Sequence, residues 1–255
     1  MSFSTTAELE GAAVLLAAAR QAVVFTGAGV STESGIRDFR GPNGIWKERD
    51  PYKTSSIQAF REDPSLYWSV SRERWQRYHE AQPNAGHYAI AAMEEAGYVA
   101  GVVTQNTDGL HLAAGSRRVI ELHGNGRTAV CLDCGAREPR ADVQARLAEQ
   151  FPPQCGVCHS RFIKPAVVFF GEPLPAAAVA AAYDLAAGAD LMLVAGSSLQ
   201  VYPAADVPLQ ATRAGAPLVI VNEEPTPFDR VARLVIRGRT GEVLPQLLEM
   251  AAGGG

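Results

Sequence analysis

Six short apolar runs, separated by segments with helical patterns, constrain the fold of this chain more than any other feature of its sequence. The runs are unbroken rather than alternating, which is typical of strands buried on both faces of a sheet. Strands that alternate with helices form a parallel sheet with helices on both sides. The sequence therefore predicts an α/β fold with a doubly wound parallel sheet. The runs cover residues 22–25, 99–104, 119–122, 191–195, 218–221 and 234–236, and helices are expected within 12–19, 64–78, 88–96, 141–149, 176–187 and 204–214.

Five of these runs end in a cluster of small or polar residues. In doubly wound sheets, ligands bind outside the carboxyl ends of the strands, where the strand order reverses. A single cluster would be an ordinary capped loop, but five at one sheet edge predict a binding site. The clusters are TGAG at 26–29, TQNTDG at 104–109, ELHGN at 121–125, AGSS at 195–198 and VNEE at 221–224.

The first cluster has the features of a phosphate cradle. Gly27 and Gly29 let the backbone turn sharply and approach a ligand closely. A helix start after such a turn points backbone N–H groups at a phosphate. The next glycine is Gly35, so the standard G-x-G-x-x-G pattern is not met. The stretch also carries the triplet DFR at 38–40, which a plain turn does not require. It predicts a nucleotide phosphate site, with an ordinary strand-to-helix turn as the alternative.

His123 differs from the other histidines because it follows a buried run inside a polar cluster. A histidine whose pKa is near neutrality can act as a general base, so His123 is the candidate base. The remaining histidines are expected to be surface residues or satisfied core residues. They are His79, His87, His111 and His159.

The other clusters carry side chains that can hold a nucleotide. Asn106 can position a water or a ribose hydroxyl, and Asp108 can accept from an amide, although both are also ordinary turn residues. The serines at 197–198 can cap a helix or hold a phosphate. Asn222 and Glu223 stand where an acid often binds the adenosine ribose in such sheets.

All four cysteines fall in two C-x-x-C pairs, Cys131 with Cys134 and Cys155 with Cys158, with twenty residues between the pairs. This spacing is typical of a tetrahedral zinc site with four thiolate ligands. Two disulfides are disfavoured in a cytoplasmic chain, and a redox pair would leave the second pair unexplained. Because four cysteine ligands leave no open position, the zinc is expected to be structural and no cysteine remains as a nucleophile.

The length and the net charge of the chain further restrict the possible classes of function. The chain has 255 residues, enough for a main domain that carries a smaller one, and a net charge of −4. This acidic balance argues against a nucleic-acid-binding domain but leaves a basic peptide as a possible substrate. No run is long enough to span a membrane and no export signal is recognised, so a cytoplasmic location is expected.

Taken together, these residues resemble the sirtuin family of NAD-dependent protein lysine deacylases. The matches follow one another in order over nearly the whole chain, which makes them far more specific than a single glycine pattern. Besides the two cysteine pairs they are GAGVSTESGIRDFRG at 27–41, TQNTDGLH at 104–111, ELHGN at 121–125, KPAVVFFGEPLP at 164–175, GSSLQVYPAA at 196–205 and VNEEPTPFD at 221–229.

The resemblance implies two domains and a reaction. Residues 1–41, 84–126 and 166–255 would form a Rossmann-like NAD-binding domain. A helical insertion at 42–83 and a zinc ribbon at 127–165 would together form the small domain. An acyl-lysine peptide and the co-substrate NAD would enter the cleft between them from opposite sides. The acyl oxygen would attack the ribose carbon that bears nicotinamide, giving lysine, nicotinamide and O-acyl-ADP-ribose.

The same resemblance implies a role for individual residues. His123 would take a proton from a ribose hydroxyl, Asn106 would order a water and the ribose, and Asp108 would hold the nicotinamide carboxamide. The NAD-site residues would be Gly27, Ala28, Gly29, Ser31, Gly35, Ile36, Asp38, Phe39, Arg40, Gln105, Asn106, Asp108, Gly196, Ser197, Ser198, Asn222, Glu223, Glu224 and Thr240, with Phe39 screening the reactive carbon from water. The peptide would lie as a strand between Val168, Phe169, Phe170, Gly171 and Glu172 on one side and Leu199, Val201 and Tyr202 on the other.

Two departures from the family pattern bear on the substrate. Arg37 stands where many members have proline, as in some bacterial-type members. Members that prefer succinyl or malonyl groups carry a Tyr-x-x-Arg pair in the helical segment, where this chain has Ser71 and Arg74. An acetyl or another neutral acyl group is therefore expected, with an acidic or longer acyl group as the alternative.

Other classes of function use parts of the same pattern. An NAD-consuming ADP-ribosyltransferase or glycohydrolase would not need the peptide-binding segments at 168–172 and 199–202. A nucleic-acid-binding zinc ribbon would be strongly basic, whereas residues 127–164 carry six basic and four acidic residues. A hydride-transferring dehydrogenase would need G-x-G-x-x-G and no zinc ribbon. The deacylase prediction is favoured over all three.

Overall fold

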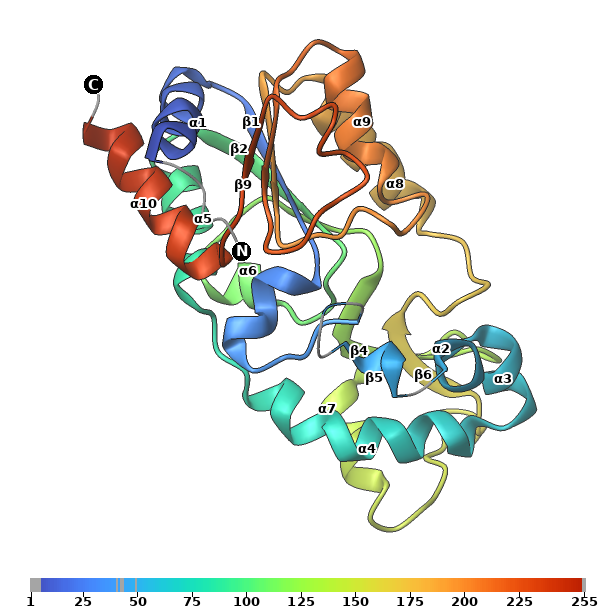
Figure 1. Cartoon of the computed structure of the whole chain (residues 1–255). Coiled ribbons are helices and arrows are strands. Elements are labelled where there is room, and N and C mark those ends of the chain that lie inside the picture. The colour runs from blue at the N-terminus through green and yellow to red at the C-terminus, as the bar shows by residue number, and fades with distance from the viewer. Residues whose placement is uncertain (1–5, 40, 42–43, 49, 254–255) are drawn as a thin grey trace.

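The computed structural model describes residues 6–39, 41, 44–48 and 50–253, and the chain builds two unequal parts around two separate sheets (Figure 1). The larger part surrounds a parallel sheet of six strands, and the smaller part surrounds an antiparallel sheet of three. The smaller part also carries the helices within residues 51–80.

The six-stranded sheet confirms the predicted doubly wound fold. Its order is β3-β2-β1-β7-β8-β9, and all neighbouring strands are parallel. The order reverses between β1 and β7, so the loops after these two strands diverge and leave a crevice, as in other sheets of this type. The strands are β1 (Ala22–Thr26), β2 (Val99–Thr104), β3 (Val119–Glu121), β7 (Leu191–Ala195), β8 (Leu218–Val221) and β9 (Leu234–Ile236).

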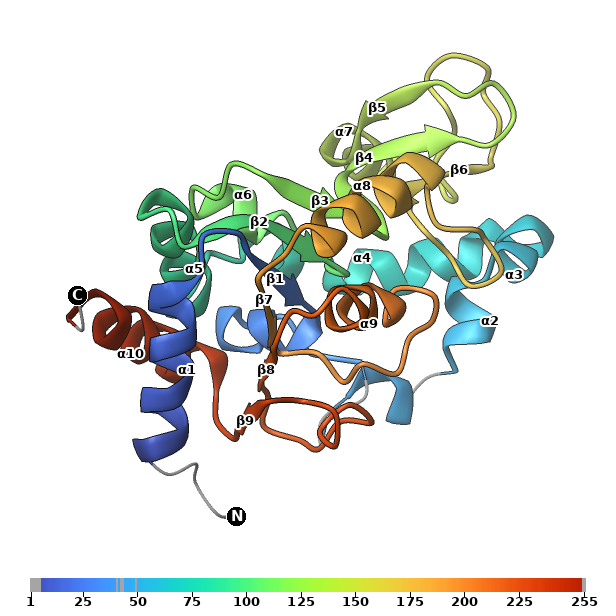
Figure 2. The same cartoon turned by 90° about the horizontal axis from the view of Figure 1, so that it is seen from above.

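Two layers of helices cover the faces of this sheet (Figure 2). Successive side chains of a strand point to opposite faces, so Val24 packs in one core while Val23 and Phe25 pack in the other. The first core lies under α1 (Thr6–Ala18), α5 (Ala85–Glu95) and α10 (Thr240–Gly253), and the second under α8 (Ala176–Ala187) and α9 (Asp206–Arg213). The unbroken apolar character of the strands follows from this double burial.

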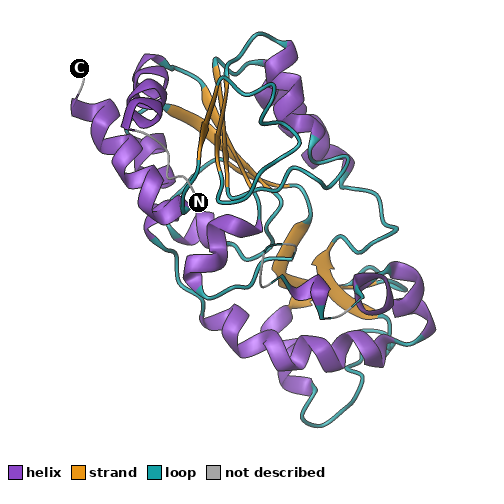
Figure 3. Ribbon diagram, viewed as in Figure 1, coloured by secondary structure: helices purple, strands orange, loops and turns teal. Residues whose placement is uncertain are grey.

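The smaller part joins two segments that are far apart in the sequence (Figure 1), and in it helices lie beside a small sheet (Figure 3). Trp68 and Phe60 share a buried cluster with Val143, Ile163 and Phe169. The indole N–H of Trp68 donates to the carbonyl of Ile163 at 3.1 Å, so the helical insertion and the ribbon have one core. The domain boundaries themselves remain a prediction. The elements are α2 (Pro51–Ser55), α3 (Ile57–Glu62), α4 (Pro64–Glu80), β4 (Gly124–Cys131), β5 (Arg137–Pro139), α7 (Arg140–Arg146) and β6 (Ile163–Val167).

The helices differ from the predictions more than the strands do. The segment after β1 is a 3₁₀ helix, η1 (Ala28–Ser34), which ends at Gly35 with a left-handed φ of 82°. Helix α10 was not predicted; it contains Pro245, and it forms because Leu244, Leu247 and Ala251 pack into the core. Two further short elements are η2 (Ile45–Lys47) and α6 (Leu110–Ala113).

Candidate active site

A cavity of about 1660 Å³ lies at the carboxyl ends of the strands and is lined by residues of both parts of the chain. Among the predicted catalytic, NAD-site and peptide-site residues that the structure describes, all line this cavity except Gly35 and Leu199. Gly35 ends η1, and Leu199 is buried in the core under α8 and α9. Arg40 lies outside the described residues. The five polar clusters therefore meet in one place.

The floor of the cavity is bare backbone where the loops after β1 and β7 touch. The N–H of Gly29 donates to the carbonyl of Gly196 at 2.8 Å. A Cβ atom at Gly29 would lie 2.8 Å from the backbone of Gly196, and one at Gly196 would lie 2.3 Å from the nitrogen of Val30. Both contacts are too short for a side chain, so glycine is required here for close approach of the two loops. The result is a smooth cradle that suits a phosphate group.

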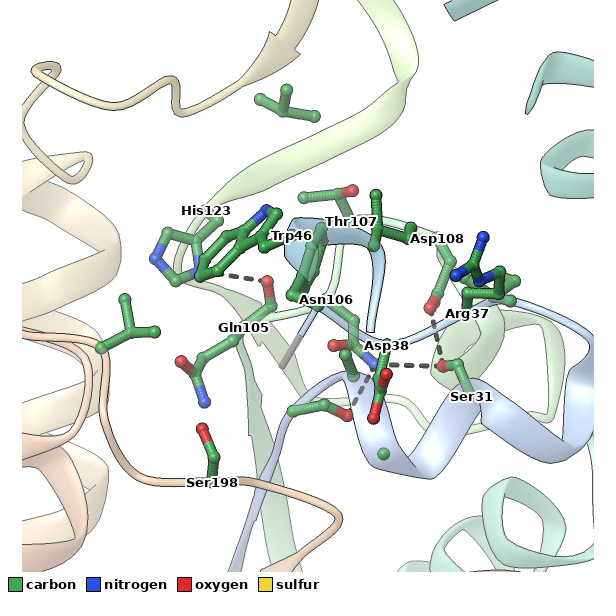
Figure 4. A pocket seen from close by; sticks show the side chains of 18 of the residues that line it. Ser31, Arg37, Asp38, Trp46, Gln105, Asn106, Thr107, Asp108, His123 and Ser198 are labelled. Carbon is green, nitrogen blue, oxygen red and sulfur yellow. Dashed lines mark hydrogen bonds between the residues drawn. The ribbon is translucent and has the colours of Figure 1, made fainter. Parts of the chain in front are cut away.

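A buried polar network lies beside this cradle (Figure 4). Asn106 donates from Nδ2 to the carbonyl of Gly27 at 3.1 Å and to Ser31 Oγ at 3.0 Å. Because both amide hydrogens are used, the carbonyl oxygen of Asn106 is the atom available to a ligand. Gln105 donates from Nε2 to Ser197 Oγ at 2.9 Å, which links the loops after β2 and β7.

Asp108 continues the network on the side of η1. It accepts from Ser31 Oγ at 2.8 Å and from the backbone N–H of Leu110 at 2.9 Å. Burial raises the pKa of the Asp108 carboxyl, and the hydrogen bonds from Leu110 and Ser31 oppose that rise. The carboxyl group is thus held in place at the cavity wall, ready to accept from an amide.

His123 stands opposite this network, in the turn between β3 and β4. Its Nδ1 lies 3.0 Å from the carbonyl oxygen of Gln105 (Figure 4). A carbonyl can only accept, so Nδ1 carries the hydrogen and Nε2 keeps its lone pair. Burial lowers the pKa of His123, and the hydrogen bond to the Gln105 carbonyl opposes this only in part. The imidazole is therefore neutral near pH 7 and has the protonation state of a general base.

Two further histidines lie beneath the site, which the sequence alone did not indicate. His87 and His111 are 0% and 2% exposed, with ring centroids 4.9 Å apart. His87 Nε2 lies 3.5 Å from Ser31 Oγ, and His111 Nε2 lies 2.9 Å from Thr26 Oγ1. Burial lowers the pKa of His87 to about 4 and that of His111 to about 3. Both imidazole rings are therefore uncharged near pH 7, and they support the site by packing beneath it. His79 and His159 are exposed, as expected.

The segment at 168–172 follows β6, lines the cavity and turns at Gly171, which has a left-handed φ of 86°. The N–H of Val168 donates to the carbonyl of His123 at 2.8 Å, which ties this segment to the candidate base. Glu172 Oε2 accepts from the N–H of Phe169 at 2.7 Å and pairs with Lys164 at 3.0 Å. Val201 and Tyr202 also line the cavity.

Several lining residues were not predicted from the sequence. One of them is Trp46, whose ring lies 5.1 Å from that of Phe39, a predicted NAD-site residue that is 46% exposed. Tyr67, Val70 and Arg140 extend the lining into the smaller part. They come from insertions whose packing no local pattern indicates, so only the structure brings them to the site.

The four cysteines form a compact cluster outside the cavity. The Sγ atoms of Cys131 and Cys158 are 3.6 Å apart, those of Cys134 and Cys155 are 3.7 Å apart, and all four lie within 4.8 Å of one another. Zn–S bonds of about 2.3 Å in a tetrahedron place the sulfurs about 3.8 Å apart. The cluster therefore fits a zinc ion. None of the four cysteines lines the cavity, which agrees with a structural role.

The fold and the site are those of a class of protein in which a doubly wound parallel sheet carries a cavity with a neutral histidine, and a four-cysteine cluster lies apart from that cavity. The model of the Sir2 family matches residues 27–203. This chain belongs to the Sir2 family. Within the described residues, no helix is long and apolar enough to cross a membrane.

Known proteins similar to this chain include two archaeal relatives and a solved complex. The "NAD-dependent protein deacylase 2" of Archaeoglobus fulgidus is 46% identical over 95% of both chains. The "NAD-dependent protein deacetylase 1" of Pyrobaculum aerophilum is 46% identical over 98% of this chain and 97% of its own. A Sir2 variant solved with a deacetylated p53 peptide and 3'-O-acetyl ADP-ribose has a TM-score of 0.90 and 41% identity, covering 94% of this chain and 97% of its own.

Proposed function

We propose that this chain is an NAD-dependent protein lysine deacylase, which moves an acyl group from a lysine side chain to ADP-ribose. The observation that carries the proposal is the pairing, in one cavity, of a glycine cradle with a neutral histidine and no cysteine nucleophile. A site with a base but no cysteine nucleophile suits a reaction whose electrophile comes with the co-substrate. The names of the similar relatives support the same activity.

The residues of the larger part would hold NAD. The cradle at Gly27 and Gly29 accepts the phosphates, because no Cβ atom blocks the approach. Ser198, Asn222 and Glu223 line the cavity where the adenosine ribose would lie in a doubly wound sheet. Asp108 would accept a hydrogen bond from the nicotinamide carboxamide. When bound, NAD supplies the electrophilic ribose carbon and carries the acyl group away.

His123 and Asn106 would act on the ribose. His123 accepts a proton at Nε2 from a ribose hydroxyl, while the carbonyl of Gln105 holds its Nδ1 hydrogen and so stabilises the charged ring. Asn106 offers its carbonyl oxygen to a water or a ribose hydroxyl, because both of its amide hydrogens are bonded to the protein. Phe39 screens the reacting carbon from water.

The acylated peptide would bind as an added strand. Residues 168–172, directly after β6, would bind one side of the peptide, and Val201 and Tyr202, which also line the cavity, would bind the other. The acyl group of the proposed substrate is acetyl. A cytoplasmic location remains a prediction, supported by cysteines that are arranged for a metal rather than for disulfides.

The test is a mass-spectrometric assay with NAD and an acetyl-lysine peptide, in which nicotinamide, free lysine peptide and O-acetyl-ADP-ribose are followed together. Equal amounts of all three products are expected. His123→Ala should fold normally and lose turnover by about 10²- to 10⁴-fold, the usual contribution of a general base. Nicotinamide release without deacylated peptide would instead indicate an ADP-ribosyltransferase or glycohydrolase, and normal turnover of His123→Ala would remove His123 from the mechanism.

A further inference from the structure

Tyr78 is a residue of the smaller part that lies in the wall of the proposed active-site cavity. It belongs to α4, whereas Asn106 and Asp108 belong to the loop after β2 in the larger part. Its hydroxyl donates to the carbonyl oxygen of Thr107, which lies in the chain between Asn106 and Asp108 (Figure 4). The proposed function so far gives Tyr78 no role, although this hydrogen bond reaches the loop that would hold nicotinamide.

The contact between Tyr78 and Thr107 consists of two hydrogen bonds. The phenol oxygen of Tyr78 also lies 3.1 Å from Oγ1 of Thr107. Because the phenol hydrogen is used on the carbonyl, the hydroxyl of Thr107 is the donor in this second bond. Burial raises the pKa of Tyr78, so the phenol keeps the hydrogen that it donates. One phenol group therefore holds both the main chain and the side chain of Thr107.

The carbonyl that Tyr78 holds belongs to the peptide group between Thr107 and Asp108. It also accepts from the N–H of Gly126 at 2.8 Å, so both acceptor positions of the oxygen are occupied. A peptide group is planar, and two hydrogen bonds to its oxygen fix the orientation of that plane. This orientation determines where the backbone of Asp108 begins, and hence where its carboxyl group lies at the cavity wall.

Asn106, on the other side of Thr107, is fixed by different contacts. Its backbone N–H donates to Thr104 Oγ1 at 3.0 Å, and its side-chain amide is bonded within the larger part. None of these bonds involves the smaller part. Loss of the Tyr78 hydroxyl should therefore affect the position of Asp108 much more than that of Asn106.

The surroundings of Tyr78 also fix its ring. The guanidinium carbon of Arg140 lies 5.8 Å from the ring centroid, a distance at which the cation attracts the ring. A Cβ atom at Gly126 would lie 2.3 Å from the Tyr78 hydroxyl. Gly126 does not have a left-handed φ, so glycine is required at this position by space rather than by backbone conformation. The room that it leaves is filled by the phenol group.

We propose that Tyr78 is a positioning residue for the co-substrate, which holds the peptide group before Asp108 so that the Asp108 carboxyl can accept from the nicotinamide carboxamide. This inference rests on the proposed deacylase function and deepens it. Recognition of nicotinamide in the larger part then depends on a helix of the smaller part. Tyr78 acts on the reaction only through Thr107.

The test compares two ligands by titration calorimetry, NAD and ADP-ribose, which share the ADP-ribose group and differ in nicotinamide. Tyr78→Phe keeps the ring and removes only the hydroxyl. It should weaken NAD binding about tenfold, because a partly buried carbonyl loses one of its hydrogen bonds, and should change ADP-ribose binding by less than about twofold. A general loss of structure would weaken the binding of both ligands. Tyr88→Phe, which changes an exposed tyrosine on α5, is the matched control and should bind both ligands as the wild type does.

Turnover of the acetyl peptide gives a second measurement of the same effect. In Tyr78→Phe, kcat/KM for NAD should fall about tenfold, as NAD binding does. The KM for the peptide should stay at the wild-type value, because the peptide-binding segments do not contact Thr107. An increase in the KM for the peptide with no change in kcat/KM for NAD would assign Tyr78 to the peptide side and overturn the proposal.

Gly126→Ala tests the contact from the other side, because its Cβ atom would displace the Tyr78 hydroxyl. It should also weaken NAD binding and leave ADP-ribose binding unchanged, so it decides the question even if Tyr78→Phe fails to fold. If both variants bind NAD as the wild type does, or lose NAD and ADP-ribose equally, the positioning role is overturned and the deacylase proposal stands. Failure of the wild-type chain to bind NAD would instead refute the proposed function, and the positioning role with it.

Discussion

The buried histidine pair beneath the site predicts a specific loss of stability in mild acid. Burial lowers the pKa of His87 to about 4 and that of His111 to about 3, whereas both return to about 6.5 in the unfolded chain. As the pH falls below 6.5, the unfolded state binds protons that the folded state does not bind. The free energy of unfolding therefore decreases. At pH 5 this amounts to about 2 kcal/mol for each histidine, or about 4 kcal/mol for the pair, relative to pH 7 or above.

The assay is urea unfolding followed by far-UV circular dichroism at pH 7 and pH 5, on the wild type and on the double variant His87→Gln/His111→Gln. The variant loses hydrogen bonds at both pH values, but the change between the two pH values isolates the protonation of the histidines. The wild type should lose about 4 kcal/mol more than the variant on going from pH 7 to pH 5. His79→Gln, which changes an exposed histidine, should behave as the wild type. An equal acid loss in the wild type and the double variant would refute the reasoning.

Three further predictions address the metal, the cradle and the base. Cys131→Ser should lower the zinc content below one ion per chain by elemental analysis and melt the core around Trp68, seen as a loss of near-UV dichroism, because metal binding is coupled to folding. Gly29→Ala should weaken NAD binding in calorimetry by about tenfold or more, since its Cβ would force the loops after β1 and β7 apart at a cost of about 1–3 kcal/mol. Because burial lowers the pKa of His123, the acidic limb of the kcat/KM profile for the acetyl peptide should lie below pH 6.5; a limb above that value would contradict the assignment of this group as the base.

The large sheet could be predicted from the sequence because its signal is local. The central strands β1 and β7 are buried on both faces, and because all five residues of each are buried, each strand is visible in the sequence as an apolar run. The polar clusters could be placed at one edge for the same reason, since the carboxyl ends of parallel strands share that edge. The predicted strand at 119–122 overran by one residue, because Leu122 is buried although it lies outside β3.

The features that could not be predicted depend on packing between distant segments. Helix α10 contains a proline, a local signal against a helix, and exists because its apolar face meets α1 and α5. The burial of His87 and His111 follows from the packing of α5 and α6 under the site, which no spacing reveals. The hydrogen bond from Arg140 to Ser71 joins residues 69 positions apart, so it has no signature in the sequence.

The core shared by the helical insertion and the ribbon has a consequence for the order in which the chain is made. Trp68 is completely buried, yet the carbonyl that accepts its N–H belongs to Ile163, 95 residues further along. At about 5–20 residues per second, a ribosome needs about 5–20 s to add those residues. During that interval the apolar face of α4 has no partner to pack against. The four-cysteine cluster of the ribbon is also incomplete until Cys158 emerges. A cell short of zinc would extend this exposure, so the nascent chain should depend on chaperones more strongly than the finished protein does.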